Sequence, residues 1–203
     1  MKRISFILLV FVFLGLYLFT YNSNSSFLDK EIKQTLFTSV SKPSWKIEMQ
    51  NTKDSFELHS LTATQEENKG VFLLDEPIFR SYWENKFRST ASSVYAILDL
   101  GEQKLLMTNN VHLTITERDE KIDLFSETID FDMRNKNFRS KNQVQMKSTS
   151  FRLNSNGFDL FQNSNGVNEL IFSKAAFEEN NASKNSFYGE ADLIIYKSPS
   201  DTF

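Results

Sequence analysis

The stretch KLLMTNNVHLTI, residues 104–115, contains the pattern from which the fold can be inferred. In its second half Val111, Leu113 and Ile115 alternate with polar side chains. Alternation with a period of two is typical of a strand that buries one face. The pair Asn109–Asn110 comes just before, and asparagine is common in turns. The stretch therefore predicts a turn followed by a half-buried strand.

A related pattern occurs 33 residues earlier, in VFLLDEPIFRSY (71–82), and 33 residues later, in NFRSKNQVQMKS (137–148). Ile78, Val111 and Val144 mark the equivalent position in the three copies. A second strand follows each copy, so each unit is a pair of antiparallel strands. A lone hairpin is marginal in water, and stacked units bury a continuous interior. We expect about three full units after a partial one, in an elongated sheet that bends over on itself.

Other segments from Trp45 onward also alternate, and none shows a long helical period. Phenylalanine is frequent (20 residues) while glycine and proline are scarce, and aromatic residues favour strands. Further strands are predicted in WKIEMQ (45–50), SFELHSLTA (55–63), KIDLFSETIDFD (121–132), SFRLNSNGFDL (150–160) and VNELIF (167–172). The predicted apolar interior either holds a hydrophobic ligand or is a filled core. The terminal strands either pair with another protein or are capped by loops.

The N-terminus predicts a membrane anchor. After Lys2 and Arg3 come 18 uncharged residues, ISFILLVFVFLGLYLFTY, which as a helix span about 27 Å of a hydrocarbon core about 30 Å thick. The two basic residues place the N-terminus in the cytoplasm and the bulk of the chain across the membrane, in a bacterium the periplasm. The alternative is a cleaved signal peptide. The apolar run is longer than such peptides carry, and no A-x-A site follows it.

These signals divide the chain into four parts. We predict a transmembrane anchor at 1–21, a linker at 22–44, a β-domain at 45–177 and a C-terminal extension at 178–203. Pro43 closes the linker because the residue before proline disfavours helix. The extension contains one apolar run, LIIY, and suggests no role.

Composition and motifs argue against several kinds of chemistry. The net charge is −3 without a basic stripe, so nucleic acid is not an expected partner. Cysteine is absent, and His59 and His112 lack metal-ligand spacing, so no metal or cofactor is expected. Asp130 and Asp132 share a strand face, which we interpret as a solvated outer surface rather than a glycosidase pair. No G-x-S-x-G or phosphate-loop motif occurs, and we predict that the protein is not an enzyme.

In the order of its segments the chain resembles the LptC family, the membrane-anchored periplasmic component of the lipopolysaccharide export machine. The resemblance covers residues 1–177: an apolar N-terminal helix, WKIEMQ, SFELHSLTA, the L-x-x-P of VFLLDEPIFRSY, and LLMTNNVHLTI where the family usually has L-x-G-N-V. Asn109 replaces the glycine of that motif, and asparagine tolerates a positive φ. Gly157 belongs to a G-x-G type segment in which Ser155 replaces the first glycine.

The resemblance implies a jellyroll fold, also called OstA-like or β-taco. It implies that the chain receives lipopolysaccharide from an inner-membrane ABC transporter and passes it to a periplasmic bridge protein of the same fold, while the anchor packs against the transporter. Acyl chains would occupy an interior lined by Ile78, Val111, Leu113, Ile115, Leu124, Val144, Met146, Phe151 and Leu153. The edge facing the transporter would contain Trp45, Ile47 and Met49, and the edge facing the bridge would contain Val167, Leu170 and Phe172.

Two alternatives stay open. The chain could be a soluble periplasmic bridge protein of the same fold, released by signal cleavage. It could instead be a structural β-domain that binds no lipid, because a packed core and a lipid groove give the same alternating pattern.

Overall fold

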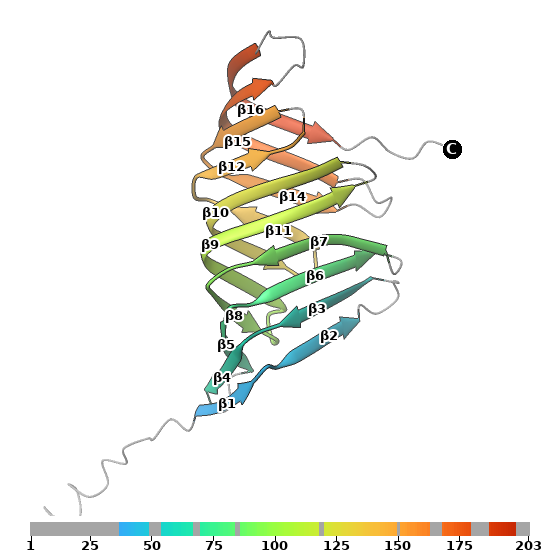
Figure 1. The fold of residues 1–203 in the computed structure, drawn as a ribbon, viewed down its shortest axis with the longest axis vertical. Helices are drawn as coiled ribbons and strands as arrows, with labels where there is room; N and C mark the ends of the chain where they lie inside the picture. The colour runs from blue at the N-terminus through green and yellow to red at the C-terminus, as the bar shows by residue number, and fades with distance from the viewer. Residues whose placement is uncertain are drawn as a thin grey trace, which may run out of the picture. The chain divides into compact units, whose positions relative to one another are not determined.

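The computed structural model describes residues 37–48, 54–66, 70–83, 86–117, 120–149, 151–162, 168–179 and 187–197. These residues form a network of sixteen strands in which every pairing is antiparallel (Figure 1). The all-β antiparallel prediction is thereby confirmed. Within the described ranges, no helix is long and apolar enough to span a membrane. The predicted anchor at 1–21 and most of the predicted linker lie outside these ranges.

The strands follow one another with short connections. They are β1 (Phe37–Ser41), β2 (Ser44–Glu48), β3 (Ser55–His59), β4 (Thr62–Glu66), β5 (Val71–Asp75), β6 (Ile78–Trp83), β7 (Lys86–Ser92), β8 (Tyr95–Asp99), β9 (Lys104–Glu117), β10 (Glu120–Asp132), β11 (Asn137–Ser140), β12 (Val144–Lys147), β13 (Phe151–Ser155), β14 (Phe158–Gln162), β15 (Asn168–Glu179) and β16 (Phe187–Lys197).

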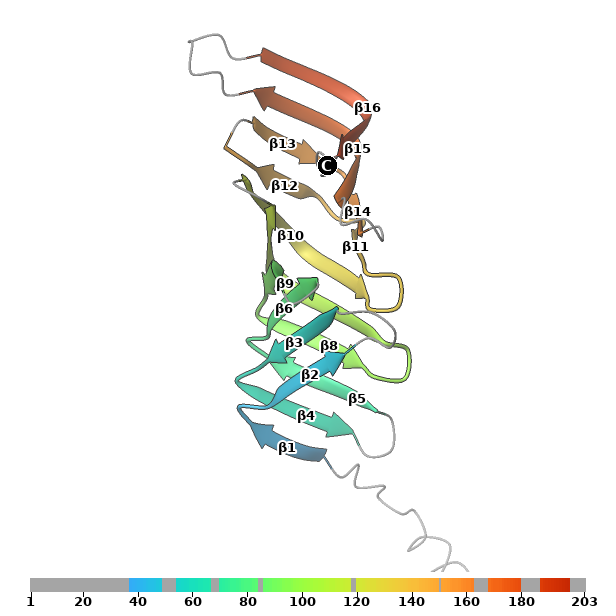
Figure 2. The same cartoon turned by 90° about the vertical axis from the view of Figure 1, so that its right-hand side faces the viewer.

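The strands form a ladder of bent rungs (Figures 1 and 2). Each rung runs along one sheet, bends at a corner and continues in the other sheet. Six rungs consist of two strands separated by a corner: β1–β2, β3–β4, β5–β6, β7–β8, β11–β12 and β13–β14. The long strands β9, β10, β15 and β16 are rungs that cross the corner without ending. One arm of each rung belongs to a front sheet, in the order β2-β3-β6-β7-β9-β10-β12-β13-β15-β16. The other arm belongs to a back sheet, in the order β1-β4-β5-β8-β9-β10-β11-β14-β15-β16.

The corner is built by residues that tolerate a left-handed backbone. Glu76, Asn109 and Asn110 have φ values of 49°, 64° and 58°. Asn109–Asn110 lie opposite one residue of β10, so β9 carries a bulge where it turns from the back sheet to the front sheet. Gly157 has a φ of 149°, and a Cβ there would lie 2.9 Å from the carbonyl oxygen of Ser140. Where a turn is predicted before Val111, β9 instead continues through the bulge at Asn109–Asn110 without ending.

The 33-residue period corresponds to two successive rungs, one out and one back. Val111 and Val144 each follow a corner and point inward. Ile78 also follows a corner, but its side chain is 42% exposed, so its predicted place in the interior is wrong. Pro77 is buried at that corner, which places Phe79 rather than Ile78 on the inner face.

The final rungs extend farther than the sequence suggested. Residue 178 lies within β15, and β16 pairs with β15 along almost its whole length. Within the predicted extension, residues 187–197 therefore form a strand that continues the sheet beyond β15. The rungs make five out-and-back pairs, more than the predicted three full units and one partial unit, because β1 and β16 were not recognised as strands.

Candidate functional site

The interior between the two sheets is the candidate site, and it is almost completely buried. Seven of the nine predicted interior residues are at most 2% exposed: Val111, Leu113, Ile115, Leu124, Val144, Met146 and Leu153. Phe151 is partly buried and packs against this core, whereas Ile78 lies outside it. The structure therefore places eight of the nine in or against one apolar interior. Whether they contact lipid stays a prediction.

Aromatic side chains join the two sheets across the interior. Trp45 of the front sheet meets Phe72 of the back sheet with ring centroids 5.6 Å apart, and Phe151 meets Tyr196 at 5.9 Å. Between these contacts lies a phenylalanine cluster, which consists of Phe56, Phe79, Phe131 and Phe138. Because the core side chains between these contacts are also almost completely buried, the described strands form a closed sandwich.

The phenylalanine cluster was not among the predicted site residues. Phe56 and Phe79 come from the front sheet, and Phe131 and Phe138 come from the back sheet. The Phe79 and Phe131 ring centroids are 4.7 Å apart, and those of Phe131 and Phe138 are 4.3 Å apart. The sequence signal was the alternation of phenylalanine with polar residues in TIDFD and in NFRS, which places each ring on an inner face.

On the side away from the corner, which we call the open side, the sheets are held by side chains. The described residues show backbone hydrogen bonds around the corner, such as Glu76 N to Val94 O at 2.8 Å, but none between the sheets on the open side. An ion pair crosses there: Lys136 Nζ donates a hydrogen bond to Asp54 Oδ2. Asp54 precedes β3 of the front sheet, and Lys136 precedes β11 of the back sheet. We call Asp54–Lys136 the rim ion pair.

A hydrogen-bonded turn positions Lys136. The Asp132 carboxylate accepts hydrogen bonds from the backbone N–H groups of Arg134 (2.9 Å) and Asn135 (3.1 Å). The Arg134 guanidinium in turn donates to the carbonyl oxygen of Gly101 at 3.0 Å, in the neighbouring turn. Burial raises the pKa of Asp132, but the hydrogen bonds from Asn135 and Arg134 outweigh it, so this pKa lies below its ordinary value.

Comparison with protein families matches residues 7–171 to the model described as "Lipopolysaccharide-assembly, LptC-related". This match covers well over half of the chain. The chain belongs to the LptC family. Comparison with curated proteins gives no match. Membership implies a role in lipopolysaccharide transport, and the bent antiparallel sheet agrees with the jellyroll expected of an LptC-related protein.

The first edge of the LptC-related fold consists of β1 and β2, and whether β2 meets a partner protein stays a prediction. In the described part of the chain, β2 pairs only with β3, and β1 pairs only with β4. Trp45 and Ile47 are partly buried on β2, where they pack against the core. Met49 lies outside the described residues.

The second edge differs from the prediction. Leu170 and Phe172 are fully buried in β15, which is paired with β14 on one side and β16 on the other. They line the interior and do not form an edge, and Val167 lies outside the described residues. Among the described strands, β16 is the one that ends the ladder. The family match stops at residue 171, before this strand.

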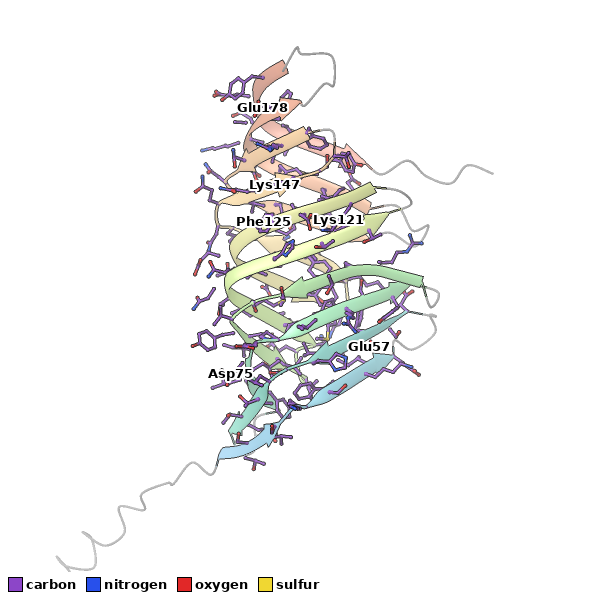
Figure 3. All side chains as sticks on the ribbon, in the orientation of Figure 1. Glu57, Asp75, Lys121, Phe125, Lys147 and Glu178 are labelled. Atoms are coloured by element: carbon purple, nitrogen blue, oxygen red, sulfur yellow. The ribbon has the colours of Figure 1, made fainter. Side chains whose placement is uncertain are left out.

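The outer face of the front sheet carries a polar cluster without an assigned role, and Figure 3 labels one of its members, Lys121. Asp123 Oδ1 accepts a hydrogen bond from Thr114 Oγ1 at 2.7 Å and lies 2.8 Å from His112 Nε2, while its Oδ2 lies 3.0 Å from Lys121 Nζ. Burial raises the pKa of Asp123, but these hydrogen bonds lower it below its ordinary value overall. In the described ranges, no group of three or more potential ligands is placed to hold a metal ion.

Proposed function

We propose that this chain receives lipopolysaccharide from an inner-membrane ABC transporter, holds the acyl chains between its two sheets, and passes the lipid to a periplasmic bridge protein of the same fold. The observation that carries the proposal is the continuous apolar interior, which extends from the rung of Trp45 to the rung of Tyr196. Exposing acyl chains to water costs about 0.8 kcal/mol per CH₂. An interior of this length offers a path that avoids most of that exposure.

The arrangement of contacts supports entry of lipid from the open side. At the corner the chain itself passes from one sheet to the other and backbone hydrogen bonds join successive rungs, whereas on the open side the described contacts between the sheets include the Phe151–Tyr196 ring contact and the rim ion pair. Such side-chain contacts can be exchanged for acyl chains without breaking a strand pairing. The sandwich seen here is then the empty state of the groove.

The two ends of the ladder support transfer between proteins. Edge strands present unpaired backbone groups that a strand of another protein can extend. We assign the edge at β1 and β2 to the transporter and the edge at β16 to the bridge protein. Pairing at both edges continues the apolar interior from one protein into the next.

Residues 1–21 anchor the chain in the inner membrane with the N-terminus in the cytoplasm, and the β-domain lies in the periplasm. The chain is a carrier and not an enzyme, and the transporter supplies the energy. An N-terminus found intact in purified membranes supports the anchor, whereas cleavage after the apolar run favours the soluble bridge protein.

Site-specific photo-crosslinking in cells tests the carrier function. Leu113 and Leu106 form a matched pair, because both are leucines on β9, but Leu113 is fully buried and Leu106 is 36% exposed on the outer face. We expect a lipopolysaccharide adduct with a photoreactive amino acid at position 113 and none at position 106. No adduct at position 113 in a folded, expressed protein would favour a purely structural β-domain.

A further inference from the structure

Each member of the rim ion pair precedes a member of the phenylalanine cluster in the sequence. Asp54 lies two residues before Phe56, and Lys136 lies two residues before Phe138. In each sheet, therefore, a charged side chain at the rim is followed by an aromatic ring in the interior. The same sequence of charge and apolar surface occurs in an amphiphile whose acidic headgroup adjoins its hydrocarbon chains.

Stability alone does not account for this ion pair. The side chains of Asp54 and Lys136 are only 6% and 17% exposed. Desolvation offsets most of the attraction in a buried ion pair, and apolar replacements of similar volume often stabilise a protein as well or better. The aromatic contacts next to it already join the sheets. We therefore expect the lysine at this rim to have a role besides holding the sheets together.

We propose that Lys136 binds the acidic headgroup of the transported lipid, and that the Asp54 carboxylate occupies the place of that group in the empty state. This inference rests on the proposed function, because it requires acyl chains to enter between the sheets. When the sheets part at the open side, Asp54 moves away with β3, and a phosphate or carboxylate of the headgroup takes its place beside Lys136. Hydrogen bonds between an ammonium and such an anion are among the strong ones in proteins.

The surroundings of Lys136 suit this exchange. It follows the turn that the Asp132 carboxylate fixes, so it keeps its position on the back sheet when the front sheet moves. The Asp132 oxygens accept hydrogen bonds from Arg134 and Asn135. Arg134, in the same turn, adds a second positive charge at this rim.

The test compares two variants that break the same ion pair from opposite sides. With a photoreactive amino acid at position 113, the lipopolysaccharide adduct is measured in cells for the otherwise native chain and for D54N, K136Q and K136R. The Tm of each purified full-length variant is also recorded. We expect both D54N and K136Q to lower the Tm. D54N removes the competing carboxylate and raises the adduct yield a few-fold, whereas K136Q removes the cation and lowers it about tenfold. K136R keeps the charge and retains most of the yield.

An exposed ion pair supplies the control. Arg139 and Asp159 pair on the outer face of the back sheet, where D159N makes the same chemical change as D54N. We expect D159N to leave the adduct yield unchanged. If D54N and K136Q move the yield in the same direction, or neither moves it, the rim ion pair is purely structural and the inference is wrong. If the native chain gives no adduct at all, the proposed function itself fails, and this inference fails with it.

Discussion

At the scale of single residues, Asp132 determines how the open side is arranged. Its carboxylate accepts hydrogen bonds from the backbone of Arg134 and Asn135 and from the Asn135 side chain. This turn brings Lys136 to the rim, and the backbone N–H of Met133 donates to the carbonyl oxygen of Gln103 at 2.9 Å. A residue that appeared from the sequence to belong to a solvated outer face is therefore part of the structure that supports the proposed headgroup site.

The lowered pKa of Asp132 predicts a pH-dependent contribution to stability. Because the folded state favours the charged carboxylate, its contribution is present above the ordinary pKa of 3.8 and is lost as the pH falls through the lower folded value. We expect D132N to lower the free energy of unfolding by about 1–2 kcal/mol at pH 7 and by much less near pH 2.5. Denaturant unfolding of the full chain at both pH values measures this difference.

Asp130 provides the control for that measurement, since its side chain is exposed on the same strand. D130N should change the free energy of unfolding by less than about 0.5 kcal/mol at either pH. Equal losses for D132N at pH 7 and pH 2.5 would show that the charge of Asp132 is not what stabilises the turn.

At the scale of elements, the strands and their inner faces were largely predictable. Alternation identified the buried faces of β9 and β12, including Val111 and Val144, because each residue of an alternating run reports which face is apolar. Alternation assigned the wrong face to Ile78, because Pro77 is buried at the corner and the inward-facing positions that follow begin at Phe79. Which residue faces inward after a corner depends on the backbone geometry of that corner, and the alternating pattern carries no information about it.

Contacts between sheets were beyond what the sequence could predict. Asp54 and Lys136 are 82 residues apart, and nothing in their local sequences indicates that they meet. The second edge was also misplaced, because Leu170 and Phe172 were the last clear alternating residues before a polar stretch. The structure shows that a further strand follows that stretch and covers them.

The position of β16 predicts which strand meets the bridge protein. Ile195 of β16 lies directly opposite Ile171 of β15 in the strand register, and Ile195 is the more exposed of the two. With a photoreactive amino acid at position 195, we expect an adduct with the bridge protein, detected by its antibody. At position 171, one strand farther in, the yield should be several-fold lower. A higher yield at position 171 would place the contact at β15 and contradict the assignment of β16 as the edge.

At the scale of the whole β-domain, the corner and the open side have different mechanical roles. Corner hydrogen bonds such as Val94 N to Asn109 O, at 3.0 Å, keep neighbouring rungs in register. The open side is joined by contacts between side chains, which include the Phe151–Tyr196 ring contact and the rim ion pair. Acyl chains that enter between the sheets can replace one apolar contact with another, so the free-energy cost of opening is repaid by lipid burial.

A covalent crosslink between the two sheets should therefore block the entry of lipid into the interior. The chain has no cysteine, so F151C/Y196C introduces the only two thiols, at positions whose rings meet across the interior with centroids 5.9 Å apart. We expect a short bifunctional thiol reagent that joins them to lower the lipopolysaccharide adduct at Leu113 several-fold relative to the same variant without reagent. That comparison removes any effect of the substitutions themselves.

The matched control joins two strands of one sheet. Arg152 of β13 lies opposite Glu178 of β15, and both are exposed, so R152C/E178C accepts the same reagent without linking front to back. Its adduct yield at Leu113 should not change on crosslinking. If the yield stays constant for F151C/Y196C as well, although the crosslink has formed, then lipid enters without parting of the sheets. In that case the interior must be reached from the ends of the ladder, through the edges at β2 and β16.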